Sequence, residues 1–256
     1  MQINAFQKNH RGLYSLLVLV ISIISREGGM DLNKIIQSLV KQVVKIEVSG
    51  KKLINGTVID IGSDMIVLYN GTDFVYIPIN HIQNFKVDCD NESEIEGPEG
   101  FPNITTGENK EYLSFGEVLT QAKGKYIEIY VTGGQPLHGY ITGIMNNYFV
   151  FQSPVYKTMY ISLKHLKWLI PYAQNEGPYG SDNHNVSLQA DNDSLASIFE
   201  IQVEKFKNKI VVFNAGGNKS IIGKVNEIED QIVEIQTARA NFIYLNLDHI
   251  QTVHKV

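Results

Sequence analysis

The 256-residue chain has a single cysteine, Cys89, and a single tryptophan, Trp168. One cysteine excludes a disulfide within the chain, so the fold cannot depend on oxidation. Cys89 lies in an acidic stretch and is available to join two chains through an intermolecular disulfide.

Sequence motifs of common enzyme sites are also missing. There is no His-Glu-x-x-His, no Cys-x-x-Cys, no Walker loop, no Gly-x-Ser-x-Gly and no glycine-rich fingerprint that opens a helix. The acidic residues after position 87 have no fixed ligand spacing, which favours a solvated linker over a calcium loop. We therefore expect a protein that is not an enzyme, with no metal and no cofactor.

Positive charge is in short supply. The formal net charge is −5, and removing residues 1–29, which hold three basic residues and one acidic residue, leaves 19 basic against 26 acidic residues, or −7. Nucleic-acid binding depends on neutralising phosphates with a basic surface. The balance of charge therefore disfavours a nucleic-acid partner.

One apolar run, residues 13–25, follows Lys8, His10 and Arg11 and resembles part of a secretory signal. It is short for a membrane span, and no small-x-small cleavage site follows it, so a membrane partner is not favoured. Codons for Arg26 to Gly29 can form a purine run that resembles a ribosome-binding site. We expect Met30 to be the true start and residues 1–29 to be an annotation artefact; a signal or anchor and a packed helix are the alternatives.

One motif occurs three times in the chain, and its tyrosines are 84 residues apart. Each copy runs from a tyrosine through alternating apolar and polar residues to a histidine and an aliphatic residue, a pattern typical of a strand with one buried face. The motif residues are Tyr76, His81 and Ile82, then Tyr160, His165 and Leu166, then Tyr244, His249 and Ile250. Internal repetition predicts three similar units.

Each unit is predicted to hold a short helix followed by five short strands. The expected helices cover residues 31–40, 112–123 and 194–206, where apolar residues recur at helical spacing. One glycine inside the second expected strand of each unit marks a bend or a close backbone approach, as small barrels need; these are Gly56, Gly139 and Gly223. Five short, bent strands predict a small barrel, so the fold class is mainly β with three tandem barrels.

Linkers rich in Gly, Pro and acidic residues separate the units. The predicted domains are residues 30–87, 111–171 and 192–256, joined by an acidic linker at 88–110 and a second linker at 172–191. The three histidines have two interpretations: a structural contact to a backbone carbonyl where the fourth strand turns into the fifth, which we favour, or a ligand or RNA contact. The tyrosines are expected to pack rather than to stack on bases.

The order of helix, glycine turn, strand with an internal glycine, hairpin and terminal histidine strand resembles the Sm-like barrel. The motif around Tyr76, His81 and Ile82 is also similar to the second Sm motif of the bacterial RNA chaperone Hfq. This resemblance implies five-stranded Sm-like or SH3-like barrels that associate by pairing the fourth strand of one unit with the fifth strand of the next. The repeated motif would then lie at the assembly edge.

Over residues 31–256 the pattern resembles the family of bacterial spore coat protein B, as in Phe213 to Gly223 and Tyr244 to Ile250. Members of that family continue into a Ser/Lys/Arg-rich tail, whereas this chain stops at Val256, which puts any function of that tail in doubt. The resemblance implies a structural protein of the endospore coat, made in the mother-cell cytoplasm, whose partners are itself and other coat proteins. The alternative is an Hfq-like RNA-binding protein, in which two chains would close a ring of six barrels.

Overall fold

The computed structural model describes residues 38–256 apart from positions 90–91, 93, 103, 105–112, 174–175, 181–193 and 218. Residues Met1–Val40 and Lys41–Val256 are separate units, and the second is described here. The suspected artefact or signal at residues 1–29 lies outside the described residues. So does most of the helix expected at 31–40, of which residues 38–40 lie in a turn.

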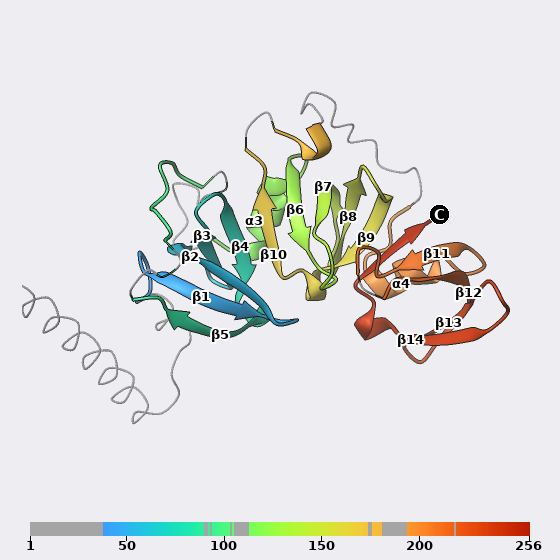
Figure 1. Cartoon of the computed structure of the whole chain (residues 1–256). Coiled ribbons are helices and arrows are strands. Elements are labelled where there is room, and N and C mark those ends of the chain that lie inside the picture. The colour runs from blue at the N-terminus through green and yellow to red at the C-terminus, as the bar shows by residue number, and fades with distance from the viewer. Residues whose placement is uncertain are drawn as a thin grey trace, which may run out of the picture. The chain divides into compact units, whose positions relative to one another are not determined.

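The described chain is mainly β, as predicted. Its fifteen strands fall into three groups of five in chain order (Figure 1). The first strand group comprises β1 Val43–Val48, β2 Lys52–Ile61, β3 Met65–Tyr69, β4 Phe74–Pro78 and β5 Ile82–Val87. The second strand group comprises β6 Tyr126–Tyr130, β7 Leu137–Ile144, β8 Tyr148–Ser153, β9 Lys157–Ser162 and β10 Trp168–Pro171. The third strand group comprises β11 Ile210–Phe213, β12 Ile221–Glu229, β13 Ile232–Gln236, β14 Phe242–Asn246 and β15 Thr252–Lys255.

Each strand group has the same internal order, in which the fifth strand pairs with the first and the fourth lies at the other edge. The whole sheet runs β14-β13-β12-β11-β15-β9-β8-β7-β6-β10-β4-β3-β2-β1-β5, and all of its pairs are antiparallel. A register shift interrupts the pairing of second and third strands at the same place in all three groups, after Val58, Ile141 and Val225. Such bulges bend the long second strand.

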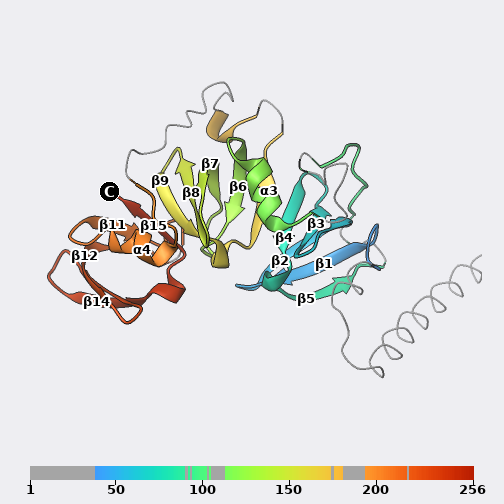
Figure 2. The ribbon, with the colours of Figure 1, turned by 180° about the vertical axis from the view of Figure 1, so that it is seen from behind.

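The sequence led us to expect three tandem five-stranded barrels, and the strand pairing does not show them. The fifteen strands form one open antiparallel sheet. The physical reason lies at the strand edges: β4 pairs with β10 and β9 pairs with β15, so the fourth strand of one group uses its free backbone groups on the next group. Figures 1 and 2 show both meeting points from opposite sides.

Two described helices precede the second and third strand groups. Helix α3, Phe115–Ala122, begins at a capping box in which Ser114 and Glu117 satisfy each other's backbone N–H groups. Its apolar residues lie on one face and are buried. Helix α4, Phe199–Glu204, is shorter than the expected 194–206, since Ile198 is extended and the hydrogen-bonded turns of the helix start after it.

Short 3₁₀ turns link the fourth and fifth strands of each group: η1 Ile79–His81, η2 Leu163–His165 and η5 Leu247–His249. A further turn, η3 Pro178–Gly180, lies between the second and third groups. No helix within the described residues is long and apolar enough to cross a membrane.

Candidate assembly interface

The repeated motif runs along the fourth strand of each group, through the 3₁₀ turn that follows, and up to the fifth strand. Its tyrosine lies on the fourth strand, its histidine ends the 3₁₀ turn, and its aliphatic residue is the first residue of the fifth strand in the first group or directly follows the turn in the others. In the first two groups the motif therefore lies on the fourth strand, which is the strand that pairs with the following group.

At the first junction, β10 adds to β4 with Leu169 opposite Tyr76. The Tyr76 side chain is fully buried. Its hydroxyl donates to the Ile104 carbonyl oxygen at 2.8 Å and accepts from the Ile104 N–H at 3.2 Å. Burial raises the pKa of Tyr76. Met65, Val67 and Tyr76 share one core with the buried face of α3 and with the second strand group.

The second junction repeats this arrangement. Strand β15 adds to β9 with Val253 opposite Tyr160, and the Ser162 N–H donates to the Gln251 carbonyl at 3.0 Å. The ring of Tyr160 lies edge-on to Phe206, with 5.4 Å between centroids. Tyr148, Val150 and Tyr160 share one core with α4 and the third strand group.

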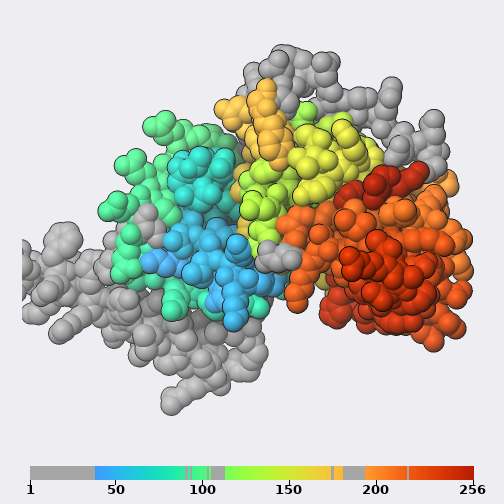
Figure 3. Space-filling model, turned by 45° about the vertical axis from the view of Figure 1, so that its right-hand side comes forward, coloured from blue at the N-terminus to red at the C-terminus, as the bar shows by residue number. Residues whose placement is uncertain are grey.

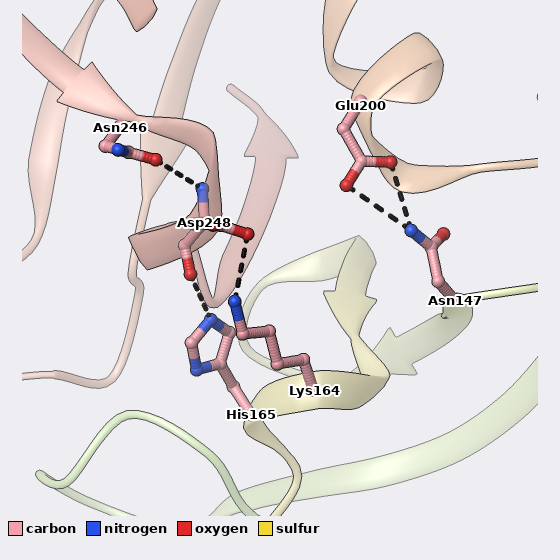
Figure 4. Close-up of polar contacts among 6 residues, drawn as sticks. All are labelled: Asn147, Lys164, His165, Glu200, Asn246 and Asp248. Carbon is pink, nitrogen blue, oxygen red and sulfur yellow. Dashed lines mark hydrogen bonds and ion pairs between the residues drawn. The ribbon is translucent and has the colours of Figure 1, made fainter. Parts of the chain in front are cut away.

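Each helix is held at its start by the group before it. The Asp64 carboxylate accepts from the Phe115 N–H at 2.7 Å, and the Asn147 side-chain oxygen accepts from the Phe199 N–H, also at 2.7 Å. The first N–H groups of a helix have no partner inside the helix, so these side chains satisfy donors that would otherwise be open. The Asn147 amide also donates to the Glu200 carboxylate at 3.0 Å (Figure 4).

Polar contacts between adjacent 3₁₀ turns complete the second junction (Figure 4). The ammonium group of Lys164 lies 2.9 Å from the Asp248 carboxylate, one motif repeat away in sequence, and His165 Nε2 lies 2.9 Å from the Asp248 carbonyl oxygen. The Lys164–Asp248 pair is well exposed, so it contributes alignment more than stability.

The three motif histidines differ in their surroundings. His81 is buried, and its Nδ1 lies 2.9 Å from the Ser49 hydroxyl. Burial, with the positive charges of Lys167 and His165, lowers the pKa of His81 to about 4. His165 is half-buried and burial also lowers its pKa, whereas the side chain of His249 is exposed.

The third copy of the motif is open where the first two are covered. Tyr76 is 0% exposed and Tyr160 is 5% exposed, but Tyr244 is 62% exposed. Ile82 is half-buried, and Leu166 and Ile250 are buried. The motif tyrosine thus lies on the fourth strand in all three groups. It is buried in the two groups where the next described group packs against it.

The three strand glycines lie where second and third strands touch. A Cβ would meet the Tyr69 carbonyl oxygen at 2.8 Å from Gly56, the Gln152 carbonyl oxygen at 2.0 Å from Gly139, and the Ile235 side chain at 2.4 Å from Gly223. A side chain at any of these positions would force adjacent strands apart. Cys89 is exposed and free, just after β5, and its intermolecular disulfide remains a prediction.

Sequence reasoning missed Asp64 and Asn147 as helix-capping residues from the preceding group. Their residue types are a partial signal, because Asp and Asn are among the types that best cap helices and each directly precedes a third strand. The sequence does not indicate which helix each residue caps, since the capped helix lies about 50 residues further along the chain. Within the described residues, no group of three or more His, Cys, Asp or Glu side chains is placed to hold a metal ion.

Comparison with known proteins identifies the family of the chain. A family model described as the YwrJ third domain matches residues 198–253, which contain α4 and most of the third strand group. Over 217 residues the chain is 33% identical to the uncharacterized protein YwrJ of Bacillus subtilis (strain 168), and the match covers 82% of this chain and 94% of that protein. The chain belongs to the YwrJ family.

This member of the YwrJ family is also similar to a protein of known location. Spore coat protein B of the same strain is 23% identical over 143 residues, which are 56% of this chain and 35% of that protein. The match thus covers about a third of spore coat protein B.

Proposed function

We propose that the chain is a structural protein of the bacterial endospore coat, made in the mother-cell cytoplasm and without catalytic activity. The observation that carries this proposal is the similarity to spore coat protein B. The junctions support a structural role, because successive strand groups join through backbone pairing and shared cores. Its partners in this proposal are other coat proteins and further copies of itself.

The proposal also assigns a fold to each strand group within the open sheet. We assign each strand group to an Sm-like unit, since its strand order places the fourth and fifth strands at opposite edges. Pairing of the fourth strand of one unit with the fifth of the next is what the Sm-like resemblance implies, and β4–β10 and β9–β15 have that pattern.

The same pairing is the one observation that favours an Hfq-like RNA-binding ring. Two chains would supply six units, and the two free edges would close the ring. The net charge of −5 weighs against this alternative, because RNA affinity depends on phosphate contacts with Lys and Arg.

Location in purified spores tests the proposal. Antibodies raised against the purified chain would be applied to vegetative cells, sporulating cells and the coat extract of washed spores. We expect the chain to appear during sporulation and to be recovered in the coat extract. Recovery from the vegetative cytosol, with none in the coat extract, would overturn the proposal.

A further inference from the structure

The outer surface of the third strand group carries the positions that the first two groups bury at their junctions. Strand register defines the equivalent positions, since the residue opposite each motif tyrosine is Val67, Val150 or Glu234. A second set of equivalent positions stands two residues earlier on each third strand and consists of Met65, Tyr148 and Ile232. Met65 and Tyr148 are fully buried by the following group, whereas Ile232 is 36% exposed.

Both ends of the described sheet are open edges. Strand β14 pairs with β13 alone, and β5 pairs with β1 alone, among the described strands. In Figure 1, β14 is the outermost strand of the third group and β5 the outermost strand of the first. An edge strand presents a row of backbone N–H and C=O groups that can accept another strand.

We propose that a second copy of this chain docks its β5 on β14, so that chains join head to tail by repeating the internal junction. The register follows from the two junctions already present. Leu169 lies opposite Tyr76 and Val253 lies opposite Tyr160. Phe85 is the equivalent residue of β5, because it lies opposite Ile46 as Leu169 lies opposite Ile129. Phe85 of one chain therefore faces Tyr244 of the next.

Further features match the internal junctions. The turn before β13, Asp230–Gln231, is exposed and holds the positions equivalent to those before β3 and β8, where Asp64 and Asn147 receive a helix start. Phe242, at 50% exposed, adds apolar surface on β14.

Acidic side chains make this surface weaker than the internal junctions. Ile232 and Tyr244 line a hollow together with Glu227, Glu229, Asp230 and Glu234. Glu234 stands where the buried junctions have Val67 and Val150. Since the chain carries a net charge of −5, two copies repel each other, and we expect added salt to strengthen their association.

The contact joins two different surfaces, so it is heterologous. Such a contact closes into a ring when the rotation between copies allows it and otherwise extends into a filament. Figure 3 shows the internal equivalent, in which the dark red end of the third group lies against the yellow strand β9. This inference deepens the self-assembly part of the proposed function and rests on it.

Sedimentation velocity of the full chain over a range of protein concentrations tests the association. We expect a mass that rises with concentration, and at least about tenfold weaker association for Ile232→Glu. Ile222→Glu is the matched control, because Ile222 is 59% exposed on β12, a strand paired on both sides. A monomer at every concentration and salt level, or equal weakening by both variants, would overturn the proposal; far-UV circular dichroism checks that both variants are folded.

Cysteine cross-linking tests the register, in chains that all carry Cys89→Ser. Residues directly opposite on antiparallel strands have Cβ atoms about 4.5–5.5 Å apart, close to the separation that a disulfide spans. Mixing Phe85→Cys with Tyr244→Cys should give a cross-linked dimer on mild oxidation. Mixing Lys86→Cys with Tyr244→Cys should give about tenfold less, because neighbouring residues of a strand point to opposite faces. No cross-link in the first mixture, or equal yields in both, would overturn the register.

The two proposals fail in different ways. A chain that stays monomeric and uncross-linked but is recovered from spore coats would remove the head-to-tail contact and leave the coat assignment. A chain that associates as described but is absent from coats would do the reverse.

Discussion

At the scale of single residues, the motif tyrosines show how one sequence pattern leads to different environments. Tyr76 and Tyr160 are buried, and each has the following strand group packed against it, whereas Tyr244 is 62% exposed. The local sequence makes all three part of a fourth strand. Burial of each tyrosine is decided by the next strand group, which is distant in sequence from the motif that it covers.

His81 gives a residue-scale prediction of pH dependence. Its pKa is lowered to about 4, first by burial and then by Lys167 and His165, whereas an unfolded-state histidine has a pKa of about 6.5. Between these values the unfolded chain binds a proton that the folded chain does not. The free energy of unfolding should therefore be highest above pH 6.5 and fall as the pH drops toward 4, by up to about 3 kcal/mol for this group.

Urea unfolding of dilute protein at several pH values measures this effect. His81→Asn should lose part of the decline between pH 6.5 and 4, and His249→Asn, at an exposed position, is the control. Burial lowers the pKa of His165 and His254 as well, so a smaller decline should remain. An unchanged pH dependence in His81→Asn would show that the buried imidazole is not the group responsible.

At the scale of secondary-structure elements, the close contact of second and third strands depends on glycine. A Cβ on residue 139 would lie 2.0 Å from the Gln152 carbonyl oxygen of β8, which belongs to the strand backbone and cannot move aside as a side chain would. The bend of β7 and its pairing with β8 are therefore incompatible with any larger residue.

Gly139→Ala is expected to lower the free energy of unfolding by about 1–3 kcal/mol, because the strands must separate to admit the methyl group. Gly116→Ala is the matched control. Nothing lies within 4 Å of a Cβ at Gly116, which is in helix α3, so that change should raise stability by about 0.5–1 kcal/mol. Thermal or urea unfolding of both variants makes the comparison. A Gly139→Ala chain that is as stable as the unsubstituted chain, or that shifts in the same direction and by the same amount as Gly116→Ala, would refute this role for Gly139.

Much of this element-scale structure is visible in the sequence. Alternating residues such as Val44, Ile46 and Val48 predict strands, and the apolar spacing after Ser114 predicts α3. The early residues of the expected helix at 194–206 misled us, because Ile198 has helical apolar spacing but is extended in the fold. Spacing reports which face is buried, and it does not report where the first backbone hydrogen bond forms.

The junctions were harder to predict. The motif suggested an assembly edge, but it could not show whether that edge pairs within one chain or between chains, since backbone groups of any strand can pair with any other. Asp64 and Asn147 were missed because their partners, Phe115 and Phe199, lie about 50 residues away. Such contacts depend on how strand groups meet, and local sequence does not carry that information.

At the scale of the whole molecule, the described strands form one open sheet that repeats a single junction and ends in two edges, β14 and β5, each of which pairs with one described strand only. The internal junctions β4–β10 and β9–β15 have the same polarity, so the free β14 and β5 edges have the right polarity to continue the series. Continuing it would let one short protein form an extended or closed assembly. That property suits a coat protein, and the proposed head-to-tail contact depends on it.

Hydrogen–deuterium exchange at low and high protein concentration is the sharpest test of edge pairing between chains. The peptide covering β14, Phe242–Asn246, should exchange markedly more slowly at high concentration, as should β5, because their outward N–H groups become paired. The peptide covering β9, Lys157–Ser162, should be protected equally at both concentrations, since its edge is paired within the chain. Exchange of β14 and β5 that does not change over about a hundredfold range of concentration would contradict pairing between chains.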